Sequence, residues 1–443
     1  ALSATDVAEF SATQAAAFTT TQLRAFTATT VGDFTETQIA ALTTTQLQAL
    51  NTSQLAVFDA TQLGALTTTQ VAALTATQIK GLNGTTVAAL AETQLAALTA
   101  TQVAALSSSG LSALDATQIG AFTTTQVGAL TRTQLAALPD TLLSALDATQ
   151  VGALNTTQVR ALTSTQLTAL DATDVAEFST AQLQALTTSQ VQSLTATNLS
   201  SLDATQVAAF AATQVQALTA TTLSALTDTQ IGALTTTQIA GLTVTQVGGL
   251  TATNVAALTT TQIAALNATQ TAGLSATAVA AFDSAQFATL NTTQTRALTA
   301  AQFAALDATD IADITTTQIA ALTATQVGNL TQTNVGDLTE TQIAAFSTTQ
   351  VQAIAATKLA ALADTQIAAL AATQIAALVT SQVQGLNATN IGALTTTQVA
   401  AFTATQLTHL STTNLRALVD TQIAALAATK IAALTTTQVG ALQ

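Results

Sequence analysis

The chain has 443 residues, of which 49% are hydrophobic and only 7% are charged, and it contains no cysteine, methionine or tryptophan. Eight basic residues against 22 acidic ones give a net charge of −14, which argues against nucleic acid and anionic membrane surfaces as partners. The lack of cysteine excludes disulfides, thiol catalysis and cysteine-based metal centres. No apolar run approaches the length of a membrane span, which is roughly 18 residues or more.

Every eighth residue from Leu2 to Leu442 is Leu, Phe or Ile, and the register never slips. We number the eight octad positions from this residue. The consensus is Leu, Thr, any residue, Thr, Gln, a branched aliphatic residue, any residue and Ala, as in residues 42–49. A fixed short period is typical of repeat proteins, whose units bury their apolar faces by stacking on neighbours. We therefore interpret residues 1–443 as a single octapeptide-repeat solenoid. Because neither end shows a polar capping repeat, we expect it to be part of a longer array.

Each octad carries the signals of one very short helix. Position 2 holds mainly Ser, Thr, Asn or Asp, the residues that accept hydrogen bonds from the first N–H groups of a helix. Gln at position 5 completes a capping box, and the large residues at positions 1 and 6 form a hydrophobic staple. The predicted fold class is therefore all-α, a solenoid with one helix per eight residues.

Along the chain, the first octads have an aromatic filling, with Phe10, Phe18, Phe26 and Phe34 at position 1. Pro139 occupies a cap position, where its missing N–H is tolerated. Further on, Thr271 and Thr295 replace the aliphatic residue of position 6. We interpret all of these departures as local adjustments of packing.

The charged residues reveal a second and longer period, equal to three and a half octads. Taken modulo 28, all 22 acidic residues fall in a window of 11 consecutive phases, between 27 and 9. Seven of the eight basic residues fall between phases 16 and 24, and Lys430 is the exception. We infer roughly 28 residues per superhelical turn of the solenoid, with one acidic and one weakly basic side. Such a narrow turn leaves no lumen, which predicts a solid rod.

The competing local structure is a β-solenoid, because Thr, Val and Ile favour strands and Thr-x-Thr pairs resemble flat ice-binding arrays. Strands need an alternation of period two, however, and the apolar positions 1 and 6 have opposite parity. A shift of one inferred turn also places position 1 above position 5, a Leu above a Gln, which breaks the ladder of identical side chains. Ice binding remains the minor alternative.

Candidate sites are few. Two acidic clusters could hold Ca²⁺ loosely, namely Asp171, Asp174 and Glu177, and Asp307, Asp310 and Asp313. The alternative is that Asp171 and Asp307 are helix caps and that the other residues belong to a solvated acidic stripe. His409 is the only imidazole and has no predicted role. We predict no catalytic residue, no cofactor and no enzymatic activity.

The unmodified unit of residues 66–73 and 98–105 resembles the octapeptide arrays of very long repetitive bacterial surface proteins of the exoprotein or adhesin type. That resemblance implies an extracellular or cell-surface, non-enzymatic protein. The leading hypothesis is a structural protein whose rods self-assemble into a fibre or sheath, with copies of itself as partners. The alternative is a rod-like spacer or adhesin scaffold whose acidic stripe binds divalent cations or a basic partner.

Overall fold

The computed structural model describes residues 3–442, and in this range it forms 55 helices of four to six residues and no strand. The chain divides into two compact units, Ala1–Leu218 and Thr219–Gln443, which we call unit 1 and unit 2 and describe separately. One helix per octad is found throughout both units. The predicted all-α solenoid of very short helices is therefore confirmed.

The helices of unit 1 have the following bounds: α1 Ala4–Ala8, α2 Ala12–Ala16, α3 Thr20–Ala25, α4 Ala28–Gly32, α5 Glu36–Ala41, α6 Thr44–Ala49, α7 Thr52–Leu55, α8 Ala60–Gly64, α9 Thr68–Ala73, α10 Ala76–Gly81, α11 Gly84–Ala88, α12 Glu92–Ala96, α13 Ala100–Ala105, α14 Ser108–Leu111, α15 Ala116–Gly120, α16 Thr124–Ala129, α17 Arg132–Ala137, α18 Asp140–Leu143, α19 Ala148–Gly152, α20 Thr156–Val159, α21 Ser164–Ala169, α22 Ala172–Ala176, α23 Thr180–Ala185, α24 Thr188–Ser193, α25 Ala196–Ser201, α26 Ala204–Ala209 and α27 Ala212–Ala217.

The helices of unit 2 follow in the same way: α28 Ala220–Ser224, α29 Asp228–Ala233, α30 Thr236–Gly241, α31 Val244–Gly248, α32 Ala252–Ala256, α33 Thr260–Ala265, α34 Ala268–Gly273, α35 Ala276–Val279, α36 Ser284–Thr289, α37 Thr292–Ala297, α38 Ala300–Ala304, α39 Ala308–Asp313, α40 Thr316–Ala321, α41 Ala324–Asn329, α42 Gln332–Asp337, α43 Glu340–Ala345, α44 Thr348–Ala353, α45 Ala356–Leu359, α46 Asp364–Ala368, α47 Ala372–Ala377, α48 Thr380–Gly385, α49 Ala388–Gly392, α50 Thr396–Ala401, α51 Ala404–Thr408, α52 Thr412–Arg416, α53 Asp420–Ala424, α54 Ala428–Ile431 and α55 Thr436–Ala441.

Capping boxes start these helices as the sequence predicts, and α6 is representative. The Thr43 hydroxyl accepts from the main-chain N–H of Gln46, and the Gln46 Oε1 accepts from the N–H of Thr43 at 2.7 Å. At the other end, Leu50 leaves the helix in an extended conformation with φ −65° and ψ 138°. Leu50 is also the residue before the next N-cap, Asn51. The chain therefore turns a corner once in every octad.

Side-chain amides join each turn to the one before it. The Nε2 of Gln78 donates to the carbonyl oxygens of Leu47 and Leu50, which lie 31 and 28 residues earlier. In unit 2, Gln294 donates in the same way to Ile263 and Leu266, at 2.8 Å each. Residues separated by three and a half octads therefore lie in successive turns within each unit. The predicted superhelical period is confirmed.

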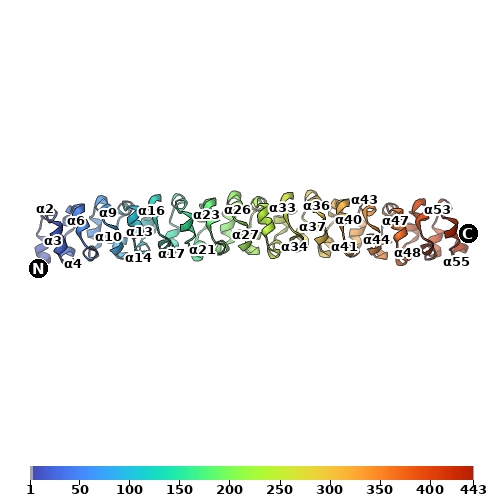
Figure 1. Ribbon diagram of the computed structural model, residues 1–443, viewed down its shortest axis with the longest axis horizontal. Coiled ribbons are helices and arrows are strands. Elements are labelled where there is room, and N and C mark those ends of the chain that lie inside the picture. Colours follow the sequence, from blue (N-terminus) through green and yellow to red (C-terminus); the bar gives the residue numbers. More distant parts are fainter. Residues whose placement is uncertain (1–2, 443) are drawn as a thin grey trace. The chain divides into compact units, whose positions relative to one another are not determined.

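The helices are staggered between turns, because one turn contains three and a half octads. Helix α10 packs against α7 and α13, which are three helices away in either direction, and Figure 1 shows α10 beside α13. Its Gln78 reaches α6, four helices back. A second set of bonds runs forward from position 7, where Gln48 donates to the Ala73 carbonyl at 2.7 Å and Arg24 donates to the Ala49 carbonyl.

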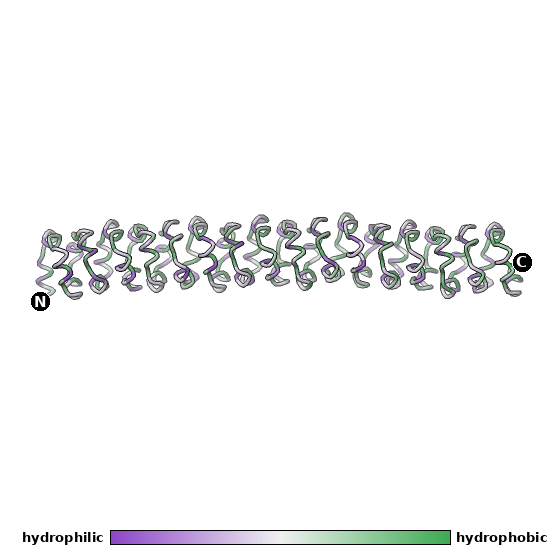
Figure 2. Tube along the Cα trace, viewed as in Figure 1, coloured by the Kyte–Doolittle hydropathy of each residue, from purple (hydrophilic) through white to green (hydrophobic). Residues whose placement is uncertain are grey.

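Positions 1 and 6 fill the interior of each unit. Within unit 1, Val71 and Ile79 have no exposed surface, and Leu74 and Leu82 are 5% and 3% exposed. Apolar stretches recur in every coil of the chain in Figure 2. The four early phenylalanines do form an aromatic filling, in which the rings of Phe10 and Phe18 meet edge to face at 5.2 Å.

Candidate functional site

Four exposed aspartates form a row on the acidic side of unit 1. Each is the N-cap of its helix, at α15, α19, α22 and α26, and we call this set the aspartate ladder: Asp115, Asp147, Asp171 and Asp203. Consecutive members are alternately four and three helices apart. With three and a half helices per turn, this spacing places one carboxylate in each of four successive turns.

The first predicted calcium cluster surrounds one rung of this ladder. The Asp171 Oδ1 accepts from the main-chain N–H of Thr173 and Asp174, at 2.7 and 2.9 Å. The Asp174 Oδ2 accepts from the N–H of Asp171 at 3.0 Å. Both carboxylates therefore cap α22, and the helix-cap interpretation of Asp171 is confirmed.

Glu177 is the C-cap of α22. The residue is partly exposed, but its Oε2 atom is buried and has no hydrogen-bond partner among the described residues. Burial raises the pKa of this carboxyl, and the negative charges of Asp174, Asp147 and Asp171 raise the pKa further. Asp147, which raises the pKa of Glu177 through its charge, is the N-cap of α19 and lies in the neighbouring turn. Successive turns therefore bring their carboxylates within electrostatic range of one another.

The second predicted cluster lies on α39 in unit 2. Asp307 caps the helix by accepting from the N–H of Asp310 at 2.9 Å, and the Asp310 Oδ2 accepts from the N–H of Asp307 in return. The Asp313 Oδ2 accepts from the Ser284 hydroxyl at 2.6 Å, one turn back. Burial raises the pKa of Asp310, the hydrogen bond from the Asp307 N–H opposes this rise, and the charges of Asp307 and Asp313 add to it.

Between residues 3 and 442, no three carboxylate or imidazole side chains converge into a group that could hold a metal ion. The carboxylates of both clusters are engaged chiefly with main-chain N–H groups. Calcium binding therefore stays a prediction. The Nδ1 of His409 lies 2.7 Å from the Thr405 carbonyl, a local contact at the end of α51.

The basic residues of unit 1 line a different surface. An open hollow of about 700 Å³ is lined by Arg132, Thr133, Ala136, Ala137, Arg160 and Ala161. A second hollow shares Arg160 and continues to Ala185, and a third shares Thr133 and reaches Lys80. We call these three adjoining hollows the basic groove. Their lining contains three cationic side chains and no acidic one.

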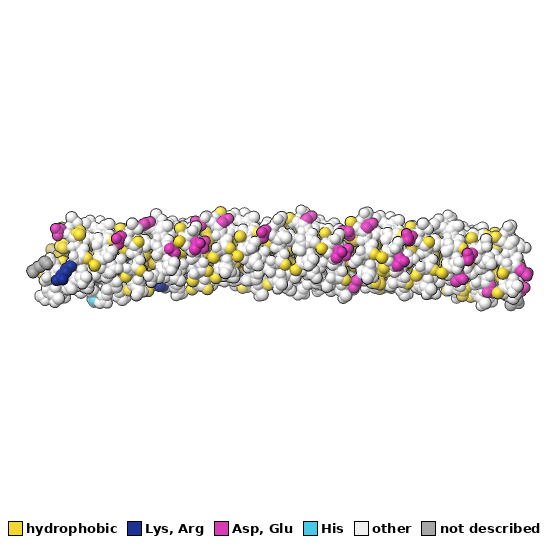
Figure 3. All heavy atoms as spheres, turned by 180° about the vertical axis from the view of Figure 1, so that it is seen from behind, with side chains coloured by type: hydrophobic (Ala, Val, Ile, Leu, Met, Phe, Trp, Pro, Cys, Tyr) yellow, Lys and Arg dark blue, Asp and Glu magenta, His cyan; other side chains and the backbone are white. Residues whose placement is uncertain are grey.

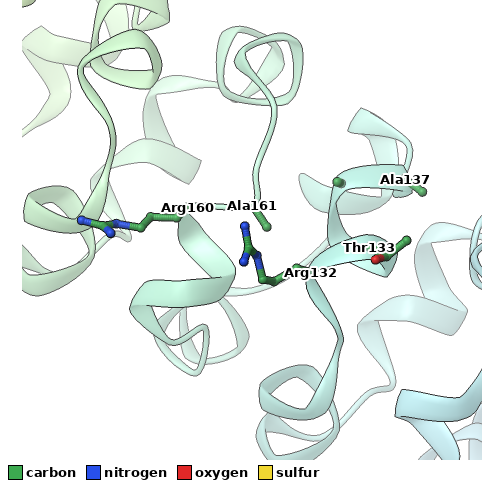
Figure 4. A pocket seen from close by; sticks show the side chains of 6 residues that line it. Arg132, Thr133, Ala137, Arg160 and Ala161 are labelled. Carbon is green, nitrogen blue, oxygen red and sulfur yellow. The ribbon is translucent and has the colours of Figure 1, made fainter.

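The two arginines of this groove are held differently. Arg132 is the first residue of α17 and is exposed, and its side chain extends toward Ala161 (Figure 4). Arg160 follows α20 and points away from Arg132, toward the next turn, where its Nε donates to the Ala185 carbonyl at 2.8 Å (Figure 4). Small side chains on α17 leave the space between them open. Since the two arginines lie one superhelical period apart, they present one positive charge per turn.

The acidic and basic surfaces lie on different sides of unit 1. Modulo 28, the ladder aspartates have phases 3 and 7, whereas Arg132 and Arg160 both have phase 20. This difference is close to half a turn. In the part of Figure 3 that draws unit 1, acidic side chains recur and few basic side chains are visible. The charges of this chain are thus segregated rather than interspersed.

A model of the ALTTAQ repeat matches residues 39–76. The match lies within unit 1 and covers the segment from the C-terminal part of α5 to the start of α10. Together with the regular array of short helices, it shows that the chain is a repeat protein. No curated protein matches the sequence, and among the described residues no helix is long and apolar enough to cross a membrane.

The position-5 glutamine has a second role that was not predicted from the sequence. Its Oε1 completes the capping box, as predicted, but its Nε2 also carries the bonds between turns. One sequence signal for this role was present. A capping box accepts Glu as readily as Gln, yet position 5 never contains Glu, which lacks the N–H donor. Asn and Lys, which do occur there, are both donors, and Lys358 donates to the Gly328 carbonyl at 2.9 Å.

Proposed function

We propose that this repeat protein is a non-enzymatic structural protein of the cell exterior, whose copies assemble side by side into a fibre or sheath. The observation that carries the proposal is the segregation of charge. Acidic and basic residues occupy different sides of a regularly pitched unit, so the acidic side of one copy complements the basic side of another. The resemblance to repetitive bacterial surface proteins supports the extracellular placement.

The surface composition agrees with such a role. Only 7% of residues are charged, and the exposed octad positions carry mainly Thr and Ala, because most of the position-5 glutamines are buried. A weakly charged surface gives little general repulsion between copies, so a few complementary charges can direct their association. The exposed large hydrophobic residues are scattered valines, such as Val57 and Val419, and the proposed contact therefore rests on charge.

The other functional classes receive less support. The described residues contain no strand, so the flat threonine ladder on which ice binding depended is absent from them. The interior cavity of unit 2, lined by residues such as Phe287 and Phe303, measures only about 10 Å³ and is too small for a substrate. This cavity therefore gives no support to an enzyme.

Light scattering and analytical ultracentrifugation of the purified chain test the proposal across a range of salt concentrations. We expect assemblies at about 10 mM salt that dissociate toward about 0.5 M, because exposed charges are screened over about 10 Å at 0.1 M ionic strength. A chain that stays at its monomer mass of 44.3 kDa at high protein concentration and low salt would contradict self-assembly.

A further inference from the structure

We propose that the basic groove of one copy binds the aspartate ladder of a second copy, with Arg132 and Arg160 pairing with ladder carboxylates in two successive superhelical turns. This inference rests on the proposed self-assembly and names the two surfaces that meet. Both surfaces lie within unit 1, between Lys80 and Asp203. The proposed occupant of the groove is thus the aspartate ladder of a second copy of the chain.

The groove is suited to carboxylates. Arg132 and Arg160 are exposed, and their guanidinium groups offer several N–H donors in a planar array that matches a carboxylate. The Nε of Arg160 is held by the Ala185 carbonyl, which fixes the side chain while leaving its terminal nitrogens for a ligand. The neighbouring residues of the lining are small, chiefly Ala and Thr, so a second surface can approach closely.

The ladder supplies carboxylates with the required spacing. Arg132 and Arg160 are one turn apart, and consecutive ladder aspartates such as Asp147 and Asp171 also belong to successive turns. Because both rows are built on the same superhelical turn, their charges repeat with the same pitch. A flexible polyanion lacks this fixed spacing. A second copy of the chain has this spacing, because its ladder is built on the same superhelical turn.

The central rungs of the ladder gain most from such a partner. Burial raises the pKa of Glu177, and repulsion from the negative charges of Asp174, Asp147 and Asp171 raises it further. Glu177 Oε2 is buried without a hydrogen-bond partner among the described residues. Cations of a neighbouring groove would offset this repulsion. The contact is therefore most favourable at Asp147 and Asp171.

The predicted contact joins different surfaces of the two copies. Each copy keeps a free groove when its ladder is occupied, and a free ladder when its groove is occupied. A heterologous contact of this kind continues from copy to copy unless a rotation closes it into a ring. The pairing therefore predicts open-ended growth rather than a closed dimer.

One variant removes the two arginine charges of the groove, and the other removes the four carboxylate charges of the ladder, while both keep the local hydrogen bonds. The groove variant combines Arg132→Ala, since Ala is common at position 3, with Arg160→Gln, since Gln48 and Gln352 at the same position donate to the equivalent carbonyls. The ladder variant changes all four ladder aspartates to Asn, which is an equally good helix cap. Arg24→Gln with Arg416→Gln is the control for Arg160→Gln at position 7, and Asp283→Asn with Asp307→Asn is the control for the ladder at position 2. All four residues lie outside the two surfaces.

Sedimentation of the full chain and its variants tests the pairing. We expect each variant alone to associate about tenfold more weakly than the unchanged chain and to lose most of the salt dependence, while the controls behave like the unchanged chain. An equimolar mixture of the groove and ladder variants should restore pairing but stop at a dimer, twice the monomer mass of 44.3 kDa. The groove variant supplies the intact ladder and the ladder variant supplies the intact groove, so no intact surface is left to bind a third copy.

Three outcomes would overturn the inference. A groove variant that assembles within twofold of the unchanged chain shows that the copies meet elsewhere, and self-assembly then stands without this contact. A mixture that shows no dimer, although both variants keep their helical circular dichroism, also rejects the pairing. Soluble poly-aspartate that competes as well as the ladder at equal carboxylate concentration rejects the matched pitch. Failure of the unchanged chain to assemble rejects the proposed function itself.

Discussion

The Gln94 side-chain amide donates to the main-chain carbonyl of Leu66 at 2.6 Å, across the boundary between two superhelical turns. The same Nε2 donates to the Leu63 carbonyl, and the Oε1 accepts from the N–H of Ala91. One buried side chain therefore caps its own helix and joins it to the preceding turn. Because Ala91 provides no side-chain cap, α12 depends on this glutamine more than most helices do.

Replacing Gln94 by Leu removes these hydrogen bonds and takes this partner from the Leu66 carbonyl and the Ala91 N–H, whereas the Leu63 carbonyl still accepts from the Leu66 N–H. We expect a loss of about 2–4 kcal/mol in the free energy of local unfolding around α12. Native-state hydrogen exchange of the α12 amides measures this loss. Gln48→Leu is the matched control, because Gln48 is exposed and donates a single bond, to Ala73. Equal effects of the two changes would show that the joining bonds add little.

Asp310 occupies the position at which other helices place a donor. In the same position, Asn198 donates to the Leu170 carbonyl at 2.9 Å, 28 residues earlier. Asp310→Asn should therefore create a bond to the Phe282 carbonyl and remove a charge whose burial is unfavourable. At pH 7 we expect a gain of about 0.5–1.5 kcal/mol in the stability of unit 2 around α39.

The gain from Asp310→Asn should depend on pH. Since the pKa of Asp310 is raised in the folded state, this state binds more protons than the unfolded chain between the ordinary value, 3.8, and the raised one. Stability therefore falls as pH rises through this window, and the deficit is complete above it. The advantage of the Asn variant should therefore shrink as pH falls through the same window. Asp6→Asn is the control, because a hydrogen bond from the Ser3 N–H lowers the pKa of Asp6, so no gain is expected there.

Thr295 borders the small cavity in the interior of unit 2 and is 2% exposed. Its hydroxyl is satisfied by the Asn291 carbonyl in its own helix. Thr295→Ile should fill the cavity with the aliphatic residue that position 6 normally holds, and should stabilise unit 2 by about 1 kcal/mol. Thr295→Val, which adds no volume, should give less, and Thr295→Ala should destabilise. Thermal melting ranks the three, and an Ile variant that melts lower than the Val variant would show overpacking.

Position 8 of one helix approaches position 3 of a helix in the preceding turn. A Cβ on Gly273 would lie 2.7 Å from the Cγ1 of Val244, which is too close without a shift. Gly273→Ala should therefore bring no benefit in the unchanged chain. In a Val244→Ala background, the same change should stabilise α34 by about 0.5–1 kcal/mol through its helix propensity. A double-mutant cycle by urea denaturation measures the coupling, and strict additivity of the two changes would contradict the close approach.

Much of this fold follows from local signals. The residues at positions 2 and 5 specify where each helix starts, and the charge period of three and a half octads gives the length of a turn before any contact is known. The side-chain bonds between turns were not foreseen. The absence of Glu from position 5 marks only their donors, whereas their acceptors are main-chain carbonyls, such as those of Leu63 and Leu66, which the sequence does not distinguish. The staggered packing follows from the half octad that remains in every turn.

The candidate surfaces were predictable only in part. The segregation of acidic from basic residues was visible in the sequence, and so was the capping role of Asp171 and Asp307. The basic groove was not, because its hollows depend on which small residues of α17 and α20 face Arg132 and Arg160. The burial of Glu177 Oε2 likewise depends on packing that no spacing reveals.

The half-integral relation between octad and turn also restricts how such a gene can change in length. Gain or loss of one octad leaves every capping box intact, but it rotates all later residues by two sevenths of a turn about the solenoid of their unit. Charges that had shared a side would then be distributed around it. Only a block of seven octads, which makes two whole turns, restores both the repeat and the charge pattern. Unequal recombination that preserves the surface chemistry should therefore proceed in steps of seven octads.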